Sequence, residues 1–308
     1  MTIYLPIAEL PVSVFSIFLM GLAVGFISGM FGVGGGFLMT PLLIFSGVPP
    51  AYAVASVSPY MAASSLSGAL SYLRKGMVDL PLAGMLLAGA LIGTLAGVFL
   101  FLWLRTVGQV DLFIRIAYTV LLGFIGTIML LESMRAILRG RRGQPPLVRR
   151  PGTHAWFMRL PLKMRFRRSR IYISVLPVIA MGAVVGLLGA ALGVGGGFIL
   201  VPALIYMLRV PTQTSVGTSL VLTLVTMAAA TVLHAEANRT VDAVLALILM
   251  LGGTVGAQFG ARAGQTVRAE HLRLLLGLLV LAVGLRVASD LVATPADPYA
   301  VTAVEAQP

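Results

Sequence analysis

The sequence predicts an all-α integral membrane protein built from two inverted-topology repeats. Three observations lead to this fold class: an apolar composition, many stretches long enough to cross a bilayer, and a glycine-rich segment that occurs twice. Of the 308 residues, 58% are hydrophobic and only 10% are charged, and the mean hydropathy is +1.00. Because soluble domains carry about 25% charged residues, we expect the chain in a lipid bilayer.

Helices that cross about 30 Å of hydrocarbon need about 20 apolar residues. The stretches of this length are 11–30, 52–73, 80–104, 112–134, 171–192, 213–234, 241–261 and 272–292. Two shorter apolar stretches, 37–47 and 198–208, each follow a run of glycines. No Lys or Arg precedes the first stretch, so it lacks the basic region of a cleaved signal peptide and is expected to stay in the membrane.

The glycine-rich segment occurs in both halves of the chain, and its two copies align without a gap. Gly25–Pro41 reads GFISGMFGVGGGFLMTP and Gly186–Pro202 reads GLLGAALGVGGGFILVP, with eight of 17 positions identical. Further matched pairs are Pro50 with Pro211 and Ser58 with Ser219 in the same register and, after a slip of two positions, Asp79 with Asp242. An internal repeat of this kind sets the architecture, and it predicts a duplicated half.

The repeat and the charge distribution together predict the organisation of the chain. Residues 1–138 form a first membrane repeat, 139–170 a basic connector, 171–292 a second membrane repeat and 293–308 a polar C-terminal tail. The connector contains 11 Lys and Arg residues and no acid, which is typical of a cytoplasmic loop. When the predicted spans are counted from this cytoplasmic connector toward each end of the chain, both termini fall on the outer side of the inner membrane.

Each half is predicted to contain three full transmembrane helices plus a glycine-broken helix pair. The number of crossings per half is then odd, so the second half enters the membrane upside down relative to the first. Interrupted helices at corresponding positions of inverted repeats are the sequence sign of a secondary transporter's binding site. Irregular backbone at membrane depth is tolerated only inside the protein or along a cavity, so we expect both glycine runs inside the bundle.

Short helices are predicted to start near Phe37 and Phe198. The first N–H groups of a helix have no partner within it, and that end is electrically positive. Two such ends facing each other would bind a small anion without a buried arginine. The expected backbone donors are Gly34, Gly35, Gly36, Phe37, Gly195, Gly196, Gly197 and Phe198. The alternative is that these glycines only permit close packing or a turn.

Hydroxyl groups and further glycines complete the set of candidate residues. Ser58, Thr218 and Ser219 lie in apolar spans and are expected to bind the substrate as neutral side-chain donors. Gly89, Gly93 and Gly97, with Gly252, Gly256 and Gly260, place a glycine at every fourth position, which predicts a close-packing seam between helices. His234 is expected at the outer end of its span.

The doubled GVGGGF with a proline four residues later, and Gly217-Thr218-Ser219-Leu220 after the second copy, resemble a known family. This is the TauE/SafE family of sulfite exporter-like permeases, and the resemblance covers about residues 11 to 292. It implies export or uptake of small sulfur-containing anions such as sulfite, sulfonates or sulfoacetate. The first half departs from the pattern, because it reads Ser56-Val57-Ser58-Pro59 where the second has Gly-Thr-Ser-Leu.

Other functions find less support in the sequence. There is no cysteine, which excludes disulfides and thiol catalysis. The sequence contains neither H-E-x-x-H nor G-x-S-x-G, so we expect no enzyme activity, no metal and no cofactor. An anion channel and an uptake permease for another small anion stay open as alternatives.

The expected partners are the small anion and the bilayer. Much of the net charge of +12 comes from the connector, where anionic lipid headgroups explain it without nucleic acid. A homodimer stays open. Moving one negative charge outward across about 100 mV gains about 2.3 kcal/mol, which favours export driven by the membrane potential.

Overall fold

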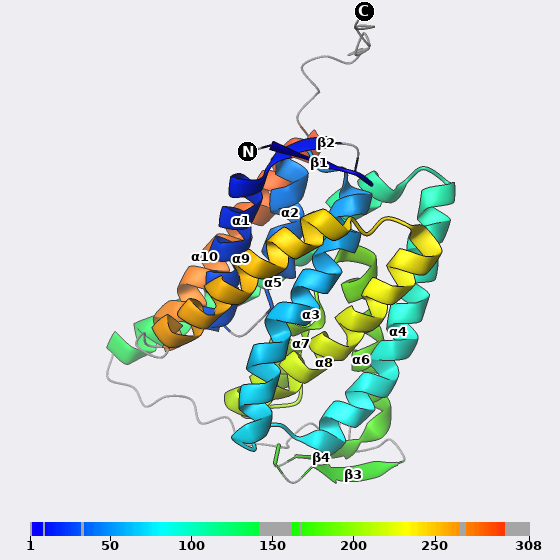
Figure 1. Ribbon diagram of the computed structural model, residues 1–308. Coiled ribbons are helices and arrows are strands. Elements are labelled where there is room, and N and C mark those ends of the chain that lie inside the picture. Colours follow the sequence, from blue (N-terminus) through cyan, green and yellow to red (C-terminus); the bar gives the residue numbers. More distant parts are fainter. Residues whose placement is uncertain are drawn as a thin grey trace, which may run out of the picture.

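The computed structural model describes residues 2–8, 10–31, 34–141, 162–166, 168–169, 171–264 and 269–292. Within these ranges the chain forms a bundle of helices with a two-stranded antiparallel hairpin at each of two opposite ends (Figure 1). Most of the predicted connector 139–170 and all of the predicted tail 293–308 lie outside the described residues.

The two halves have the same order of elements. The first half consists of β1 (Thr2–Leu5), β2 (Leu10–Ser13), α1 (Val14–Phe31), α2 (Gly36–Phe45), α3 (Pro50–Arg74), α4 (Leu80–Thr106) and α5 (Val110–Arg141). The second consists of β3 (Lys163–Phe166), β4 (Ile171–Ser174), α6 (Val175–Leu192), α7 (Gly196–Tyr206), α8 (Thr212–Leu233), the π-helical turn η1 (His234–Asn238), α9 (Ala243–Gly264) and α10 (Ala269–Val292). In the two halves, the two strands and the first helix begin and end at equivalent positions, related by the same offset as the two copies of the glycine-rich segment.

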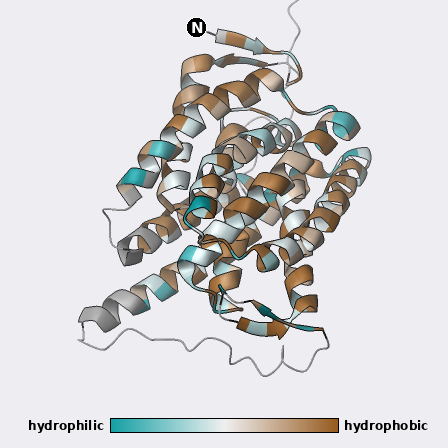
Figure 2. Cartoon of the chain, turned by 60° about the horizontal axis from the view of Figure 1, so that its bottom comes forward, coloured by the Kyte–Doolittle hydropathy of each residue, from teal (hydrophilic) through white to brown (hydrophobic). Residues whose placement is uncertain are grey.

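Among the described residues, seven helices are long and apolar enough to cross a membrane: α1, α4, α5, α6, α8 with η1, α9 and α10. Figure 2 shows hydrophobic positions along most of their length. Helix α3 has 25 residues, enough to span, but its serines lower its hydropathy. More than half of α3 is buried, so its polar groups are shielded by neighbouring helices rather than exposed to lipid. The prediction of an all-α integral membrane protein is confirmed.

Helices of one half pack mainly against helices of the other. Helix α1 packs against α9 and α4 against α6, while α3 pairs with α8 and α5 with α10. When the two halves are exchanged, the pair of α1 with α9 becomes the pair of α6 with α4, and the other two pairs each map onto themselves. The hairpins that precede α1 and α6 lie at opposite ends of the bundle (Figure 1), so these two equivalent helices start from opposite ends.

The predicted glycine seam is found at two helix contacts. A Cβ added to any of the six glycines would overlap a backbone carbonyl of the facing helix, so only glycine allows the backbones to approach this closely. Gly89, Gly93 and Gly97 of α4 face the carbonyls of Ile179, Ala183 and Leu187 in α6, and Gly252, Gly256 and Gly260 of α9 face those of Phe18, Leu22 and Phe26 in α1. The contact between α4 and α6 therefore has an equivalent between α9 and α1.

The matched pair Asp79 and Asp242 anchors the two hairpins. The Asp79 carboxylate accepts hydrogen bonds from the backbone N–H and the hydroxyl of Ser169, both at 2.8 Å, in the turn between β3 and β4. The Asp242 carboxylate accepts from the N–H groups of Ile7 at 3.0 Å and Ala8 at 3.4 Å, in the turn between β1 and β2. Each carboxylate also accepts from the first turn of the helix that follows it. Each half thus fastens the hairpin of the other.

The two hairpins were not predicted from the sequence. Their strands have only four residues each, and β3 belongs to the segment with the strongest positive charge. The hairpin β3–β4 spans the predicted boundary between connector and second repeat at residue 170.

Candidate functional site

Both glycine runs separate a long helix from a short one. Gly34 precedes α2 with φ of +80°, and Gly195 precedes α7 with φ of +72°. These left-handed conformations are costly for residues with a Cβ, and the two glycines occupy matched positions of the repeat. The short helices have 10 and 11 residues, or about 15 Å each, which is about half of a hydrocarbon core.

The two breaks meet inside the bundle. The rings of Phe37 and Phe198 stack with centroids 4.3 Å apart and an interplanar angle of 11°. Both rings are fully buried, and a Cβ on Gly36 would lie 2.5 Å from the carbonyl oxygen of Gly193. The structure therefore brings the first turns of α2 and α7 together, and all eight predicted backbone donors are buried. Gly32 and Val33 of the first run lie outside the described residues.

Two hydroxyl groups bind the carbonyls of the second break. The Tyr118 hydroxyl on α5 donates to the Leu192 carbonyl at 2.9 Å, and the Thr40 hydroxyl on α2 donates to the Gly193 carbonyl at 3.3 Å. These bonds pair backbone carbonyl groups at the C-terminal, electrically negative end of α6. The main polar groups that remain at the break are the backbone N–H groups at the start of α7. Neither Thr40 nor Tyr118 was predicted from the sequence, although Thr40 is the one polar side chain of α2.

Met61 occupies the space between the two breaks. Its sulfur lies against Gly36 and its terminal methyl against Gly34 and Gly195. The methyl group of Thr223 on α8 also lies near Gly34 and Gly195. Both side chains are buried, so the described conformation is closed at this point.

The three predicted side-chain donors have different environments. The Ser58 hydroxyl donates to the Val54 carbonyl at 3.3 Å, and the Ser219 hydroxyl donates to the Val216 carbonyl at 2.9 Å. Both bonds stay within one helix and use the hydroxyl proton. Thr218 is buried, and its hydroxyl has no partner in the part of the chain that the structure describes. It lies five residues from Thr223, about 7.5 Å along α8.

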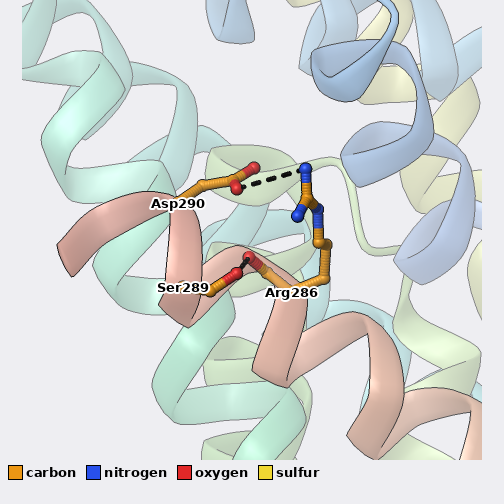
Figure 3. Close-up of polar contacts among 3 residues, drawn as sticks. All are labelled: Arg286, Ser289 and Asp290. Atoms are coloured by element: carbon orange, nitrogen blue, oxygen red, sulfur yellow. Dashed lines mark hydrogen bonds and ion pairs between the residues drawn. The ribbon is translucent and has the colours of Figure 1, made fainter. Parts of the chain in front are cut away.

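A shallow pocket opens at the end of the bundle that carries β1 and β2. It is lined by Pro41, Ile44, Phe45, Ile114, Arg115, Tyr118, Val287 and Asp290, from α2, α5 and α10. Figure 3 shows the neighbouring ion pair between Arg286 and Asp290, with 3.6 Å between nitrogen and oxygen. The Arg286 guanidinium also lies 5.9 Å from the centre of the Phe45 ring. Tyr118 lines the pocket, and its hydroxyl binds the Leu192 carbonyl at the second break. The pocket and the second break are therefore one side chain apart.

His234 lies at the C-terminal end of α8, as predicted for the end of its span. Its side chain is fully buried, with Nε2 3.0 Å from the Ala190 carbonyl oxygen and Nδ1 2.7 Å from the Asn238 side-chain nitrogen. The ring also meets Phe101 edge-on at 5.1 Å. Both ring nitrogens are therefore used within the protein, and His234 ties the turn η1 to the end of α6.

Comparison with known proteins agrees with this architecture. The model of the family described as "Sulfite exporter TauE/SafE" matches residues 17–287. The chain belongs to the TauE/SafE family. The match covers both glycine breaks, both short helices and nearly all of the membrane-spanning helices.

Named relatives of this TauE/SafE protein are bacterial and plant proteins. It is 28% identical over 272 residues to the probable membrane transporter protein YjnA of Bacillus subtilis, covering 88% of this chain and 98% of that protein. It is 31% identical over 270 residues to a probable membrane transporter protein of Xylella fastidiosa, covering 86% and 90%. A 58-residue segment is 41% identical to the sulfite exporter TauE/SafE family protein 5 of Arabidopsis thaliana, covering 19% and 13%. No solved structure matches significantly.

The TauE/SafE protein is thus a multi-pass membrane protein of a transporter family. The relatives' names agree with the expectation that it is not an enzyme. Among the described residues, no group of three or more His, Cys, Asp and Glu could hold a metal ion.

Proposed function

We propose that this TauE/SafE protein is a secondary transporter of small sulfur-containing anions, such as sulfite or an organosulfonate, across the inner membrane. The anion binds between the N-terminal ends of α2 and α7. The observation that carries this proposal is the stack of Phe37 on Phe198, because it brings two helix starts together with a left-handed glycine before each. The resemblance to sulfite exporters supplies the sulfur-containing class of substrate.

The electrostatics of the two helix ends favour an anion. Each helix N-terminus carries about half a positive charge together with N–H groups that point outward. Neither short helix contains a charged residue. Recognition by neutral donors leaves the bound anion without a fixed countercharge, so the anion can leave again.

The packing of the halves supports alternating access by an inverted-topology repeat. The contacts of α1 with α9 and of α4 with α6 exchange with each other when the halves are swapped, and the two breaks meet where such an axis would pass. Inverted repeats transport by rocking one part against another around a fixed site. The left-handed glycines at 34 and 195 are the positions where the backbone is best able to bend.

The proposed orientation places the end with β3 and β4 in the cytoplasm. The Arg168 guanidinium binds the backbone carbonyl of Gly76, next to Arg74 and Lys75, so basic residues from the predicted connector and from the loop between α3 and α4 share this end. Cytoplasmic loops carry such an excess of Lys and Arg. Both termini would then lie outside, with the connector close to anionic lipid headgroups.

The test is uptake of radiolabelled sulfite and sulfoacetate by proteoliposomes that contain the purified protein. We expect saturable uptake that increases when an inside-positive potential is imposed, because one negative charge moves with each cycle. Liposomes without protein are the control. Flux that does not saturate would indicate a channel, and absence of uptake for every sulfur-containing anion would contradict the proposed substrate class.

A further inference from the structure

Two buried hydroxyl groups beside the glycine runs have no hydrogen-bond partner among the residues that the structure describes. Tyr60 on α3 is 0% exposed and Thr223 on α8 is 1% exposed. Within the described part of the chain, neither hydroxyl makes a hydrogen bond. An unsatisfied buried polar group costs about 1 to 3 kcal/mol, and such a group in a native protein calls for an explanation, such as a ligand that is absent from the described state.

Each hydroxyl lies at the start of one short helix. A Cβ added to Gly35, the residue that precedes α2, would lie 2.6 Å from the Tyr60 hydroxyl oxygen. A Cβ added to Gly196, the first residue of α7, would lie 3.5 Å from the Thr223 hydroxyl oxygen. The Tyr60 ring is held in place because it packs directly on the backbone of Gly253 in α9.

The two hydroxyls occupy equivalent places in the two halves. Gly35 and Gly196, the glycines beside which they lie, are matched positions of the repeat. Their helices, α3 and α8, are equivalent elements that pack against each other. Because the residue types differ, a sequence comparison of the halves does not match Tyr60 with Thr223. They are matched by their burial and by their positions beside the short helices.

We propose that the hydroxyls of Tyr60 and Thr223 are the side-chain donors that bind the oxygen atoms of a small oxyanion. This inference rests on the proposed function and specifies the binding groups of that site. One hydroxyl donates at the start of α2 and the other at the start of α7, beside the backbone N–H groups. A sulfur oxyanion carries three or more oxygens and can accept from both sides at once. Met61 leaves the space between them when the anion enters.

The test removes each hydroxyl without changing the rest of the side chain. We expect Tyr60→Phe and Thr223→Val each to raise the KM of sulfite or sulfoacetate uptake about 10-fold, since a hydrogen bond to a charged group is lost. The thermal stability of the anion-free variants should equal or exceed that of the wild type, because removing these hydroxyls breaks no hydrogen bond within the described part of the folded protein. This combination separates a binding role from a structural one.

One variant provides a matched control. The Thr226 hydroxyl, about one turn from Thr223 on α8, donates to the Leu222 carbonyl at 2.8 Å. Thr226→Val removes a satisfied hydroxyl, so we expect lower thermal stability and an unchanged KM.

The outcomes distinguish this inference from the proposed function. Wild-type KM in both Tyr60→Phe and Thr223→Val, with uptake by the wild type intact, would overturn the inference alone. Lower stability with unchanged KM in these variants would also overturn it, by showing that the hydroxyls are structural. A wild-type protein that takes up none of the anions would overturn both proposals.

Discussion

The terminal methyl group of Met61 lies directly against the backbone of Gly195, and the sulfur of the same side chain lies against Gly36. One side chain from α3 therefore contacts both glycine breaks and fills the space where the two short helices begin. A methionine is suited to this position because its unbranched, flexible chain can adopt other rotamers at low cost. In this conformation, the space between the two short helices is filled by the Met61 side chain, which can move to another rotamer.

The size and shape of residue 61 should control transport. We expect Met61→Leu, which conserves volume, to keep more than half of the wild-type uptake rate. Met61→Phe should reduce the rate at least 10-fold, because a rigid ring cannot withdraw from between the breaks. Initial rates in proteoliposomes, normalised to inserted protein, provide the measurement. Equal rates for both variants would show that Met61 is not in the path.

The two hairpin anchors should contribute similarly to stability. Asp79→Asn and Asp242→Asn each weaken hydrogen bonds from a hairpin turn to a buried carboxylate. We expect a loss of about 1.5 to 3 kcal/mol each, the usual range for hydrogen bonds to charged groups. Thermal unfolding in detergent is the measurement, with the exposed Asp111 changed to Asn as the control. A loss no greater than that of Asp111→Asn would contradict the anchoring role.

The close contact of α4 with α6 should not tolerate a methyl group at its centre. A Cβ on Gly93 would overlap the Ala183 carbonyl, whereas a Cβ on Gly84 in the same helix would meet nothing within 4 Å. We therefore expect Gly93→Ala to lower the unfolding temperature and the yield of monodisperse protein. Gly84→Ala should be neutral or stabilising by up to about 1 kcal/mol, because alanine favours helix. Similar behaviour of the two variants would mean that the helices can separate at little cost.

Much of the fold was accessible from the sequence because it depends on length, hydropathy and repetition. The spans follow from the need to cross hydrocarbon with helices, and the spacing of Gly89, Gly93 and Gly97 predicted a contact that the structure confirms. Met61 and Thr223 were not predicted, because which side chain fills the space between two helices depends on how α3 and α8 pack. The partnering of Ser58 within its own helix is likewise invisible in the sequence, since any serine in a helix has that option.

The central claim is that the anion binds at the helix starts that follow Gly34 and Gly195. Gly195→Ala tests it most directly, because a Cβ there would strain the left-handed backbone and overlap Met61. Gly123→Ala is the matched control, since nothing lies within 4 Å of the added Cβ. The measurement is saturable sulfite uptake by proteoliposomes, with correct folding checked by monodispersity. The account predicts at least 10-fold slower uptake for folded Gly195→Ala and a wild-type rate for Gly123→Ala; wild-type uptake by both would contradict it.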